Sequence, residues 1–332
     1  MHPRYAIVLA VAVGAALALV AWRARAPQPK ALLPSGPPPL APLAIVPPGP
    51  AFVLSVDLKR LRASPAGRAL LGRGLFELTG QPCQGQLAGD VDEVVLALPA
   101  ESKPGRAGAE GFGLIAAGRF QGSAVAACAA QQIRARHGDP VQTRIGSFAS
   151  VRDRHQTAEV SARDGLLVVS EGAYLRELLD GAEGQRGEGS EAERARDSLH
   201  AELRRVFATD SPVSATLALP NGWLSQALGE PGAELSPLSA ARSAALRADV
   251  GAGVDVSGLV ACDASEPCEH LERFLGNARS DLQTLLPEAA ALLGRITFTR
   301  KGARIDFSAH LRAEELGKLS LSITPSASAS AR

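Results

Sequence analysis

Residues 295–311 read RITFTRKGARIDFSAHL, and this stretch decides the fold class. Apolar residues alternate with polar neighbours on each side of Lys301 and Gly302, with Ile296 and Phe298 before the pair and Ile305 and Phe307 after it. Alternation with period two is the pattern of strands that bury one face. A Lys-Gly pair between two such runs favours a tight turn. The stretch therefore predicts an antiparallel hairpin with one apolar and one polar face.

The first part of the chain shows a related pattern. Residues 91–99 and 112–120 are apolar runs separated by a polar loop, which suits an antiparallel pair. Ser123 begins a helical pattern, with the serine as the expected cap. Further strands are predicted over residues 143–151, 157–162 and 166–170, and a helix over 173–180. The resulting order is strand, strand, helix, strand, strand.

That order recurs in the second part of the chain, where residues 213–220 echo residues 91–99. Expected strands at 248–256 and 258–264, a helix at 268–286 and the final hairpin follow. The sequence therefore predicts an α+β fold with a duplicated strand-strand-helix-strand-strand module with antiparallel sheets, over residues 51–196 and 197–323. Residues 181–196 are Gly-rich and charged, so we expect a mobile loop there that leads into a helix at 199–207. Residues 324–332 are expected to be disordered.

The amino-terminal region carries a membrane signal. Residues 5–22 read YAIVLAVAVGAALALVAW without a charge, which is long enough for a transmembrane helix. A cleaved secretory signal is the alternative, since Ala24 and Ala26 form an A-x-A-like pattern. We assign residues 1–26 to a signal-anchor. Residues 27–50 are Pro-rich and predict an extended polyproline linker.

Two signals disagree about the side of the membrane on which the body of the protein lies. Arg4 precedes the apolar run, whereas Arg23, Arg25 and Lys30 follow it, so the positive-inside rule favours the cytoplasm. A signal-anchor with an even number of cysteines behind it favours export. We expect a single-pass protein of a bacterial inner membrane with its carboxyl-terminal domain in the periplasm. A cytoplasmic protein with free thiols stays the alternative.

The chain has four cysteines, and we expect two disulfide bonds. Cys262 and Cys268 enclose five residues with a turn signal, so their Cα atoms can approach to disulfide distance. Cys83 and Cys128 then remain for each other. A zinc site would have only Cys262, Cys268 and His270, and Cys-x2-4-Cys pairs are missing from the sequence. A Cys-x-x-Cys redox motif is missing as well.

Composition excludes some functions. Thirty-five basic residues against 34 acidic ones leave a formal charge of +1, so nucleic acid is not an expected partner. The sequence has no Walker A, G-x-S-x-G or H-E-x-x-H motif. We therefore expect no cofactor, no metal and no catalytic residues of a known motif.

For the weaker candidate sites, a purely structural role is the simpler interpretation. Residues 251–258, GAGVDVSG, do not match the dinucleotide fingerprint and suit a closely packed strand. Ser147, Asp153 and His155 could be assembled into a triad, but a solvated turn is the simpler interpretation. Residues 152–156, RDRHQ, could contact an acidic partner or a phospholipid headgroup, although an exposed hairpin end is the simpler interpretation.

Three acids in GDVDEVV form a further candidate. Asp90, Asp92 and Glu93 do not have the spacing of a calcium-binding EF-hand loop. We expect these carboxylates to cap the entrance of a strand.

Residues 47–61, PPGPAFVLSVDLKRL, follow the anchor and the Pro-rich segment and predict a strand that turns into a helix. This opening resembles that of uncharacterised, membrane-anchored, exported bacterial proteins that carry a duplicated α+β domain of unknown function. The resemblance implies an exported location and this fold, and it transfers no active site.

These observations favour a non-enzymatic, membrane-tethered envelope protein that acts by binding or scaffolding. Its expected partners are the membrane and an unidentified protein or envelope component. The alternative is an envelope enzyme with an active site in the cleft between the two modules, where ligand pockets often form.

Overall fold

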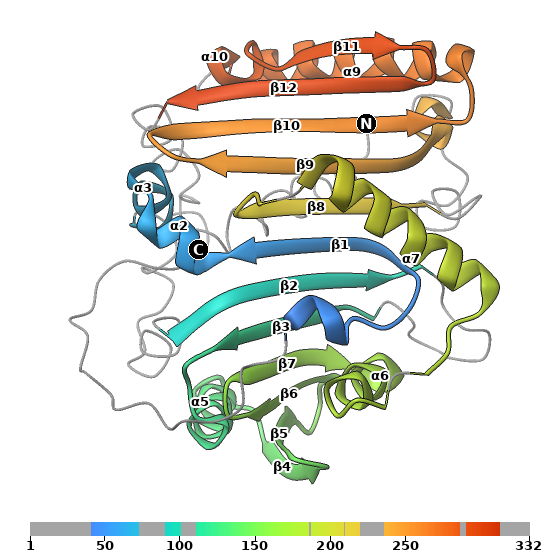
Figure 1. The fold of residues 1–332 in the computed structure, drawn as a ribbon. Coiled ribbons are helices and arrows are strands. Elements are labelled where there is room, and N and C mark those ends of the chain that lie inside the picture. Colours follow the sequence, from blue (N-terminus) through green and yellow to red (C-terminus); the bar gives the residue numbers. More distant parts are fainter. Residues whose placement is uncertain are drawn as a thin grey trace, which may run out of the picture.

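The computed structural model describes residues 41–72, 90–100, 111–185, 187–208, 210–219, 236–285 and 290–312. They form an α+β fold on one antiparallel, 12-stranded sheet, with the order β11-β12-β10-β9-β8-β1-β2-β3-β7-β6-β5-β4 (Figure 1). The predicted α+β class and antiparallel pairing are confirmed. Strands of the two predicted modules share this sheet, because β1 pairs with β8 at its centre.

The strands divide into two halves on either side of that central pair. The first half comprises β1 (Pro50–Asp57), β2 (Val91–Pro99), β3 (Gly113–Gly118), β4 (Pro140–Ile145), β5 (Phe148–Asp153), β6 (Ala158–Arg163) and β7 (Leu166–Glu171). The second half comprises β8 (Val213–Ala218), β9 (Ala241–Val250), β10 (Gly253–Cys262), β11 (Thr297–Lys301) and β12 (Arg304–Arg312).

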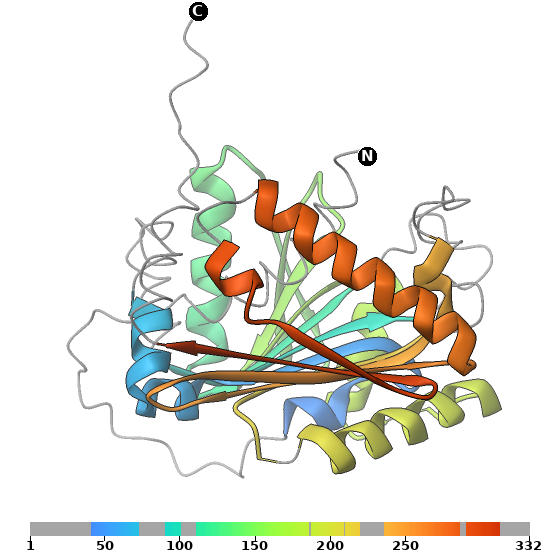
Figure 2. The same ribbon diagram turned by 90° about the horizontal axis from the view of Figure 1, so that it is seen from above.

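Helices lie on both faces of the sheet. Their bounds are η1 (Pro42–Ile45), α2 (Leu58–Ala63), α3 (Pro65–Gly72), α5 (Gly122–Ala135), α6 (Gly172–Ala182), α7 (Glu191–Leu203), η2 (Arg204–Ala208), η3 (Ser236–Ala240), α9 (Ser265–Leu285) and α10 (Ala290–Leu293). Figure 2 shows α5 and α9 on one face and α7 with η1 on the other. We call these the α9 face and the α7 face.

The α7 face of the first half is an apolar core. Leu178 and Leu175 of α6 pack with Ile45 of η1 against Ile115 and Val168 of the sheet. Leu178, Ile115 and Val168 are each 0% exposed. Burial of such side chains stabilises a fold by roughly 1.5–3 kcal/mol each. The helix α6 therefore closes this side of the first half.

The second half has an apolar core on the α9 face. Cys268 and Leu271 of α9 pack against Ile305 of β12, and all three are buried. A Cβ atom added at Gly258 of β10 would meet the ring of Phe307, so glycine permits this ring to lie on the strand. Gly258 thus fits the close packing expected of residues 251–258.

Residues 41–50, which we expected to belong to the extended linker, are packed on the fold. Pro42–Ile45 form a 3-10 helix, and Ile45 is only 1% exposed. The backbone N–H of Gly49 donates to Asp197 Oδ1 (3.0 Å), and Arg196 Nε donates to Gly49 O (3.0 Å). Prolines permit this path because Pro42 begins the 3-10 helix, where its missing N–H costs nothing.

Two predicted strands have different bounds in the structure. Residues 143–151 are a hairpin of β4 and β5, because Gly146 adopts a φ of 55° and turns the chain. Residues 248–256 likewise contain the turn between β9 and β10, so the two strands are Ala241–Val250 and Gly253–Cys262.

Two helix starts also differ from the prediction. The cap of α5 is Gln121 rather than Ser123, and the N–H of Gly122 donates to Asp164 Oδ1 (2.9 Å). A Cβ at Gly122 would meet the backbone of Arg163, so only glycine fits there. The predicted mobile loop at 181–196 is partly helical, since α7 begins at Glu191 behind a capping box of Ser190 and Glu193.

Several predicted features lie outside the described residues: the membrane segment at 5–22, linker residues 27–40, Cys83 and the tail at 324–332. Among the helices that the structure describes, none is long and apolar enough to cross a membrane.

Candidate functional site

A shallow, open pocket lies on the α7 face of the second half. Its volume is ≈ 290 Å³. It is lined by Phe207 of η2, Arg247 of β9, Ser257 and Gly258 of β10, Thr297 and Thr299 of β11, and Arg304, Asp306, Phe307 and Ser308 of β12. We call it the hydroxyl pocket, because four of these side chains carry a hydroxyl group.

Strand register brings the polar side chains into rows. The first row crosses four adjacent strands through Arg247, Ser257, Ser308 and Thr297. The second row contains Ala245, Leu259, Asp306 and Thr299. Residues directly opposite in paired strands point to the same face. The first row and the Asp306–Thr299 end of the second row therefore form the floor of the hydroxyl pocket, whereas Ala245 and Leu259 are buried. The two rows lie about 7 Å apart, which is two residues along a strand.

Arg247 is held at one end of the first row. Its Nε donates to Ser257 Oγ (3.1 Å), and its Nη1 donates to the carbonyl oxygen of Phe207 (3.4 Å). The guanidinium carbon also lies 5.5 Å from the centroid of the Phe207 ring. At the other end of this row, Thr297 Oγ1 and Ser308 Oγ are 2.9 Å apart. These contacts fix the orientation of the polar groups in the floor.

Asp306 supplies the carboxylate of the second row. Lys301 Nζ lies 3.1 Å from its Oδ2, and Arg304 Nε donates to its Oδ1 (2.5 Å). Burial raises the pKa of Asp306, but the hydrogen bonds and charges of Lys301 and Arg304 outweigh it and keep the pKa below its usual value. Asp306 is therefore an anionic hydrogen-bond acceptor at neutral pH.

The alternation of β12 explains why this face is open to a ligand. Ile305 packs with Cys268 and Leu271 on the α9 face, whereas Asp306 and Ser308 line the hydroxyl pocket. On the α7 face, the apolar packing of Leu203 of α7 extends only as far as Ala245 and Leu259. Beyond Leu259 this face carries polar side chains, which can stay in contact with water and need no helix to bury them.

Chemically, the hydroxyl pocket can both donate and accept hydrogen bonds. A serine or threonine hydroxyl has one donor and two acceptor lone pairs, and a guanidinium only donates. Asp306 only accepts. Among the described residues, no cluster of three His, Cys, Asp or Glu side chains could hold a metal ion.

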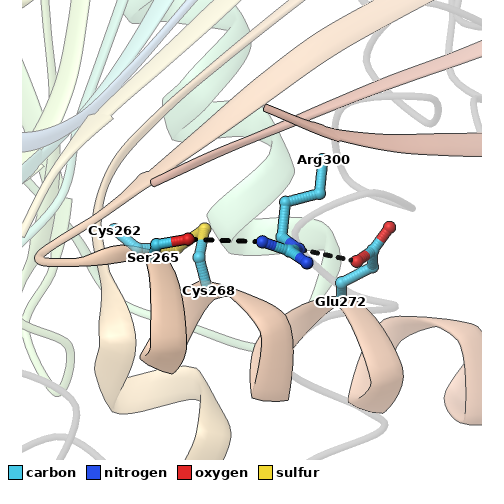
Figure 3. The surroundings of a disulfide bond; sticks show 5 residues. All are labelled: Cys262, Ser265, Cys268, Glu272 and Arg300. Atoms are coloured by element: carbon cyan, nitrogen blue, oxygen red, sulfur yellow. Dashed lines mark hydrogen bonds and ion pairs between the residues drawn. A yellow bond between two sulfur atoms is a disulfide. The ribbon is translucent and has the colours of Figure 1, made fainter. Parts of the chain in front are cut away.

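The disulfide bond between Cys262 and Cys268 is present on the other side of the sheet (Figure 3). The two Cα atoms are 5.5 Å apart. This bond joins the end of β10 to the first turn of α9. Arg300 of β11 reaches the same helix, since its Nη1 donates to Ser265 Oγ in the first turn (3.3 Å) and its Nε to Glu272 Oε2 further along (3.1 Å).

Cys128 is not a free thiol. The bond between Cys83 and Cys128 stays a prediction, because Cys83 lies outside the described residues.

The structure does not bring Ser147, Asp153 and His155 together as a triad. Ser147 precedes β5, whereas Asp153 ends it, so the strand separates them by about 20 Å. Asp153 Oδ1 accepts from the backbone N–H of His155 (3.2 Å) within the turn to β6. Arg154 of the RDRHQ segment pairs with Asp139 (2.8 Å). This segment is an exposed hairpin end.

Asp90, Asp92 and Glu93 do not converge on a cation site either. Asp92 pairs with Arg62 (2.6 Å) and lies 3.6 Å from Arg119. Asp90 accepts from the backbone N–H of Arg119 through its own carbonyl oxygen (2.6 Å). Burial, together with the nearby charge of Asp57, raises the pKa of the Glu93 carboxyl.

His270 is exposed on α9 and lies 3.4 Å from the Arg273 guanidinium. It does not join the bonded cysteines in a metal site.

Sequence reasoning missed the hydroxyl pocket. Four of its residues lie in the hairpin at 295–311, where the sequence indicates only a polar strand face: Thr297, Thr299, Asp306 and Ser308. The signal that could have found them is the run of polar residues at every second position. Arg247 and Ser257 join them only through the pairing of β9, β10 and β12, which short-range patterns do not reveal.

Comparisons with known proteins identify no family. No protein-family model matches the sequence, and no curated protein matches it. A solved structure described as "Structure of crystal form I of TP0453" is similar in fold, with a TM-score of 0.45 and 12% sequence identity. The match covers 85% of this chain and 97% of that chain. At this level of similarity it carries no functional information.

Proposed function

We propose that the protein is an exported, membrane-tethered binding protein and that the hydroxyl pocket is its binding site. The observation that carries this proposal is the polar floor on the α7 face of the second half. Its side chains are held in fixed orientations by Arg247, the Phe207 ring and the Thr297–Ser308 pair. Polar groups held in place in this way fix the orientation of a ligand in a binding site.

Binding is favoured over catalysis by the composition of the hydroxyl pocket. Asp306 is the one carboxylate among its lining residues, and two cationic side chains hold it in the charged form. A general acid or base works best with a pKa near the operating pH, and these neighbours move the pKa of Asp306 away from it. The carboxylate is suited to orient a ligand.

The export part of the proposal is supported by the Cys262–Cys268 disulfide. Disulfide bonds persist in oxidising compartments such as the periplasm and are rare in the cytosol. Residues 5–22 would supply the anchor and residues 27–40 the extended spacer.

We also propose that the two halves are copies of one module. From the central pair, the first half runs outward as β1-β2-β3-β7-β6 and the second as β8-β9-β10-β12-β11. In each half a helix, α5 or α9, follows the third strand and lies on the α9 face (Figure 2). The hairpin β4–β5 is then an insertion in the first copy.

The location is tested with a single introduced thiol. A Thr299→Cys variant, in cells with a permeabilised outer membrane, should react with a maleimide that cannot cross the inner membrane. Thr143→Cys on the opposite edge strand is the matched position and should react equally. Labelling of both positions only after the inner membrane is lysed would place the domain in the cytoplasm and overturn the export proposal.

The binding site is tested by photo-crosslinking in cells. A photoreactive residue in place of Thr299 should give a discrete adduct, and the same residue in place of Thr143 should not. Adducts of equal yield at both positions, or none at Thr299, would contradict a binding role for the hydroxyl pocket.

A further inference from the structure

We infer that the hydroxyl pocket recognises an uncharged sugar ring, either free or at the end of a glycan. This inference rests on the proposed binding function and adds the chemical class of the ligand. It follows from the mixture of hydrogen-bonding groups in the two rows, from their balanced charge and from their spacing.

The first step concerns donors and acceptors. Ser257 Oγ accepts from Arg247 Nε, so its own O–H is directed to another acceptor. Asp306 in the next row only accepts, and the Thr299 hydroxyl beside it does both. A sugar hydroxyl also donates and accepts, so one ring can satisfy both rows. A ligand with acceptors alone cannot use Asp306.

The second step concerns charge. Arg247 lies 3.6 Å from Asp249, and Asp306 pairs with Lys301 and Arg304, so each cationic group already faces a carboxylate. An anion placed over the floor would be attracted by Arg247 but repelled by Asp306 and Asp249. A neutral polar ligand has no such conflict.

The third step concerns size. The rows are about 7 Å apart, which a single pyranose ring with its hydroxyls spans. The pocket volume of ≈ 290 Å³ lies just below the usual range of about 300–1,000 Å³ for ligand sites, so only a small ligand fits. The Phe207 ring at the edge of the pocket adds an apolar wall for the C–H groups of the sugar. One ring therefore fits, and a longer glycan would extend into solvent.

The test is a ligand-observed NMR titration of the full chain in a detergent without a sugar headgroup. The probes are glucose, galactose, mannose and N-acetylglucosamine, with acetate and inorganic phosphate as charged comparisons. We expect at least one sugar to bind with an affinity that changes less than twofold between low and high salt, because screening does not act on a neutral ligand. The two anions should bind at least tenfold more weakly.

Three variants separate the site from the rest of the surface. Thr299→Val keeps the shape and removes one hydroxyl, so sugar binding should weaken by about 3- to 10-fold. Asp306→Asn removes the charged acceptor and should weaken binding by about 10-fold or more. Thr143→Val, on the exposed edge strand β4, should leave the affinity unchanged.

Free and glycan-bound rings are distinguished by comparing N-acetylglucosamine with its trisaccharide, and glucose with maltotriose. Equal affinities indicate a terminal or free ring, and a gain of tenfold or more for the trisaccharide indicates a longer glycan. Stronger binding of phosphate or acetate than of every sugar would overturn the inference, as would sugar binding that Thr299→Val leaves intact. If no probe binds while crosslinking at Thr299 succeeds, the ligand class is wrong and the binding function stands.

Discussion

The α7 face of the sheet is closed by α6 in the first half, whereas in the second half it is open beyond the apolar contact of Leu203 with Ala245 and Leu259. In the first half, Ile115 and Val168 lie beneath Leu178 of α6 and have no exposed surface. In the second half, Ser257 and Ser308 occupy adjacent strands of the same face and border a pocket. The two regions show that side-chain polarity at every second position decides whether a sheet face takes a helix or remains available to a ligand.

Three serine hydroxyls of the closed face have internal partners, whereas the buried hydroxyl of Tyr174 on α6 has no hydrogen-bond partner among the described residues. The hydroxyls of Ser150 and Ser161 are buried and bond to each other, and Ser170 Oγ donates to the carbonyl oxygen of Phe112 (2.6 Å). Burial makes such pairing necessary, because an unpaired buried hydroxyl costs about 1–3 kcal/mol. In the open face, solvent satisfies the hydroxyls and a ligand can replace the solvent.

The largest expected effect tests the closure by α6. Leu178→Ala removes a fully buried side chain between α6 and the sheet, and it should lower the free energy of unfolding by about 2–5 kcal/mol in urea titrations. Leu285→Ala on α9 is the matched control, since Leu285 is 68% exposed, and it should change stability by less than about 0.5 kcal/mol. Equal effects would mean that α6 does not close the first half.

A second prediction concerns the disulfide bond that joins β10 to α9 on the α9 face of the second half. Replacing both Cys262 and Cys268 by alanine should lower the free energy of unfolding by about 2 kcal/mol, because the bond closes a short loop. Hydrogen exchange should become faster in α9 and stay unchanged in α5. Faster exchange in both helices would show that the two halves open together.

The boundary between the halves should respond to pH through His200. Its Nε2 bonds to the carbonyl oxygen of Pro50 (2.9 Å) and its Nδ1 to Thr216 Oγ1 (2.8 Å), which ties α7 to β1 and β8. Burial is the largest cause that lowers the pKa of His200 below its ordinary value of 6.5.

Because the unfolded chain then binds the proton more readily, the stability contributed by neutral His200 is present above pH 6.5 and is lost as the pH falls towards the lowered pKa. The loss is at most about 1.4 kcal/mol per pH unit. Urea unfolding at pH 7 and pH 5 measures it, with His200→Gln as the variant that should lose this dependence. A pH dependence that survives the substitution would assign the effect to other groups.

The smallest expected effect comes from the open face. Thr299→Val and Ser308→Ala should each change the free energy of unfolding by less than about 0.5 kcal/mol, because these side chains are exposed and bury no core. Thermal melts of both variants beside the wild-type chain provide the check. A loss of several kcal/mol would mean that the floor of the hydroxyl pocket is structural.

Local patterns predicted most of the strands and little of their arrangement. The alternation around Ile305 and Phe307 and the turn at Gly302 are short-range features, and the structure has both. The predicted strand at 248–256 begins seven residues after the true start of β9, because residues 241–247, ARSAALR, contain no β-branched or aromatic side chain. The turn at Gly146 was missed, although Gly146 and Ser147 between Ile145 and Phe148 form a two-residue hairpin signal.

Long-range pairing could not be predicted in this way. Strands β1 and β8 are far apart in the sequence, and their contact depends on edges that both halves leave unpaired. The hydroxyl pocket could not be predicted for the same reason, because Arg247 and Thr297 fall in one row only when four strands adopt one register. The Cys262–Cys268 disulfide could be predicted from the sequence because its two cysteines are only 6 residues apart in the chain.

The position of β1 has a mechanical consequence. This strand is paired on both sides, with β2 and β8, and the chain enters it through Gly49, which is bonded to α7. A pull applied ahead of residue 41 would therefore load two ladders in shear at the centre of the sheet instead of peeling a strand from its rim. A domain that is pulled through its central strand should therefore resist unfolding by force, and its outermost strands should carry little of the load.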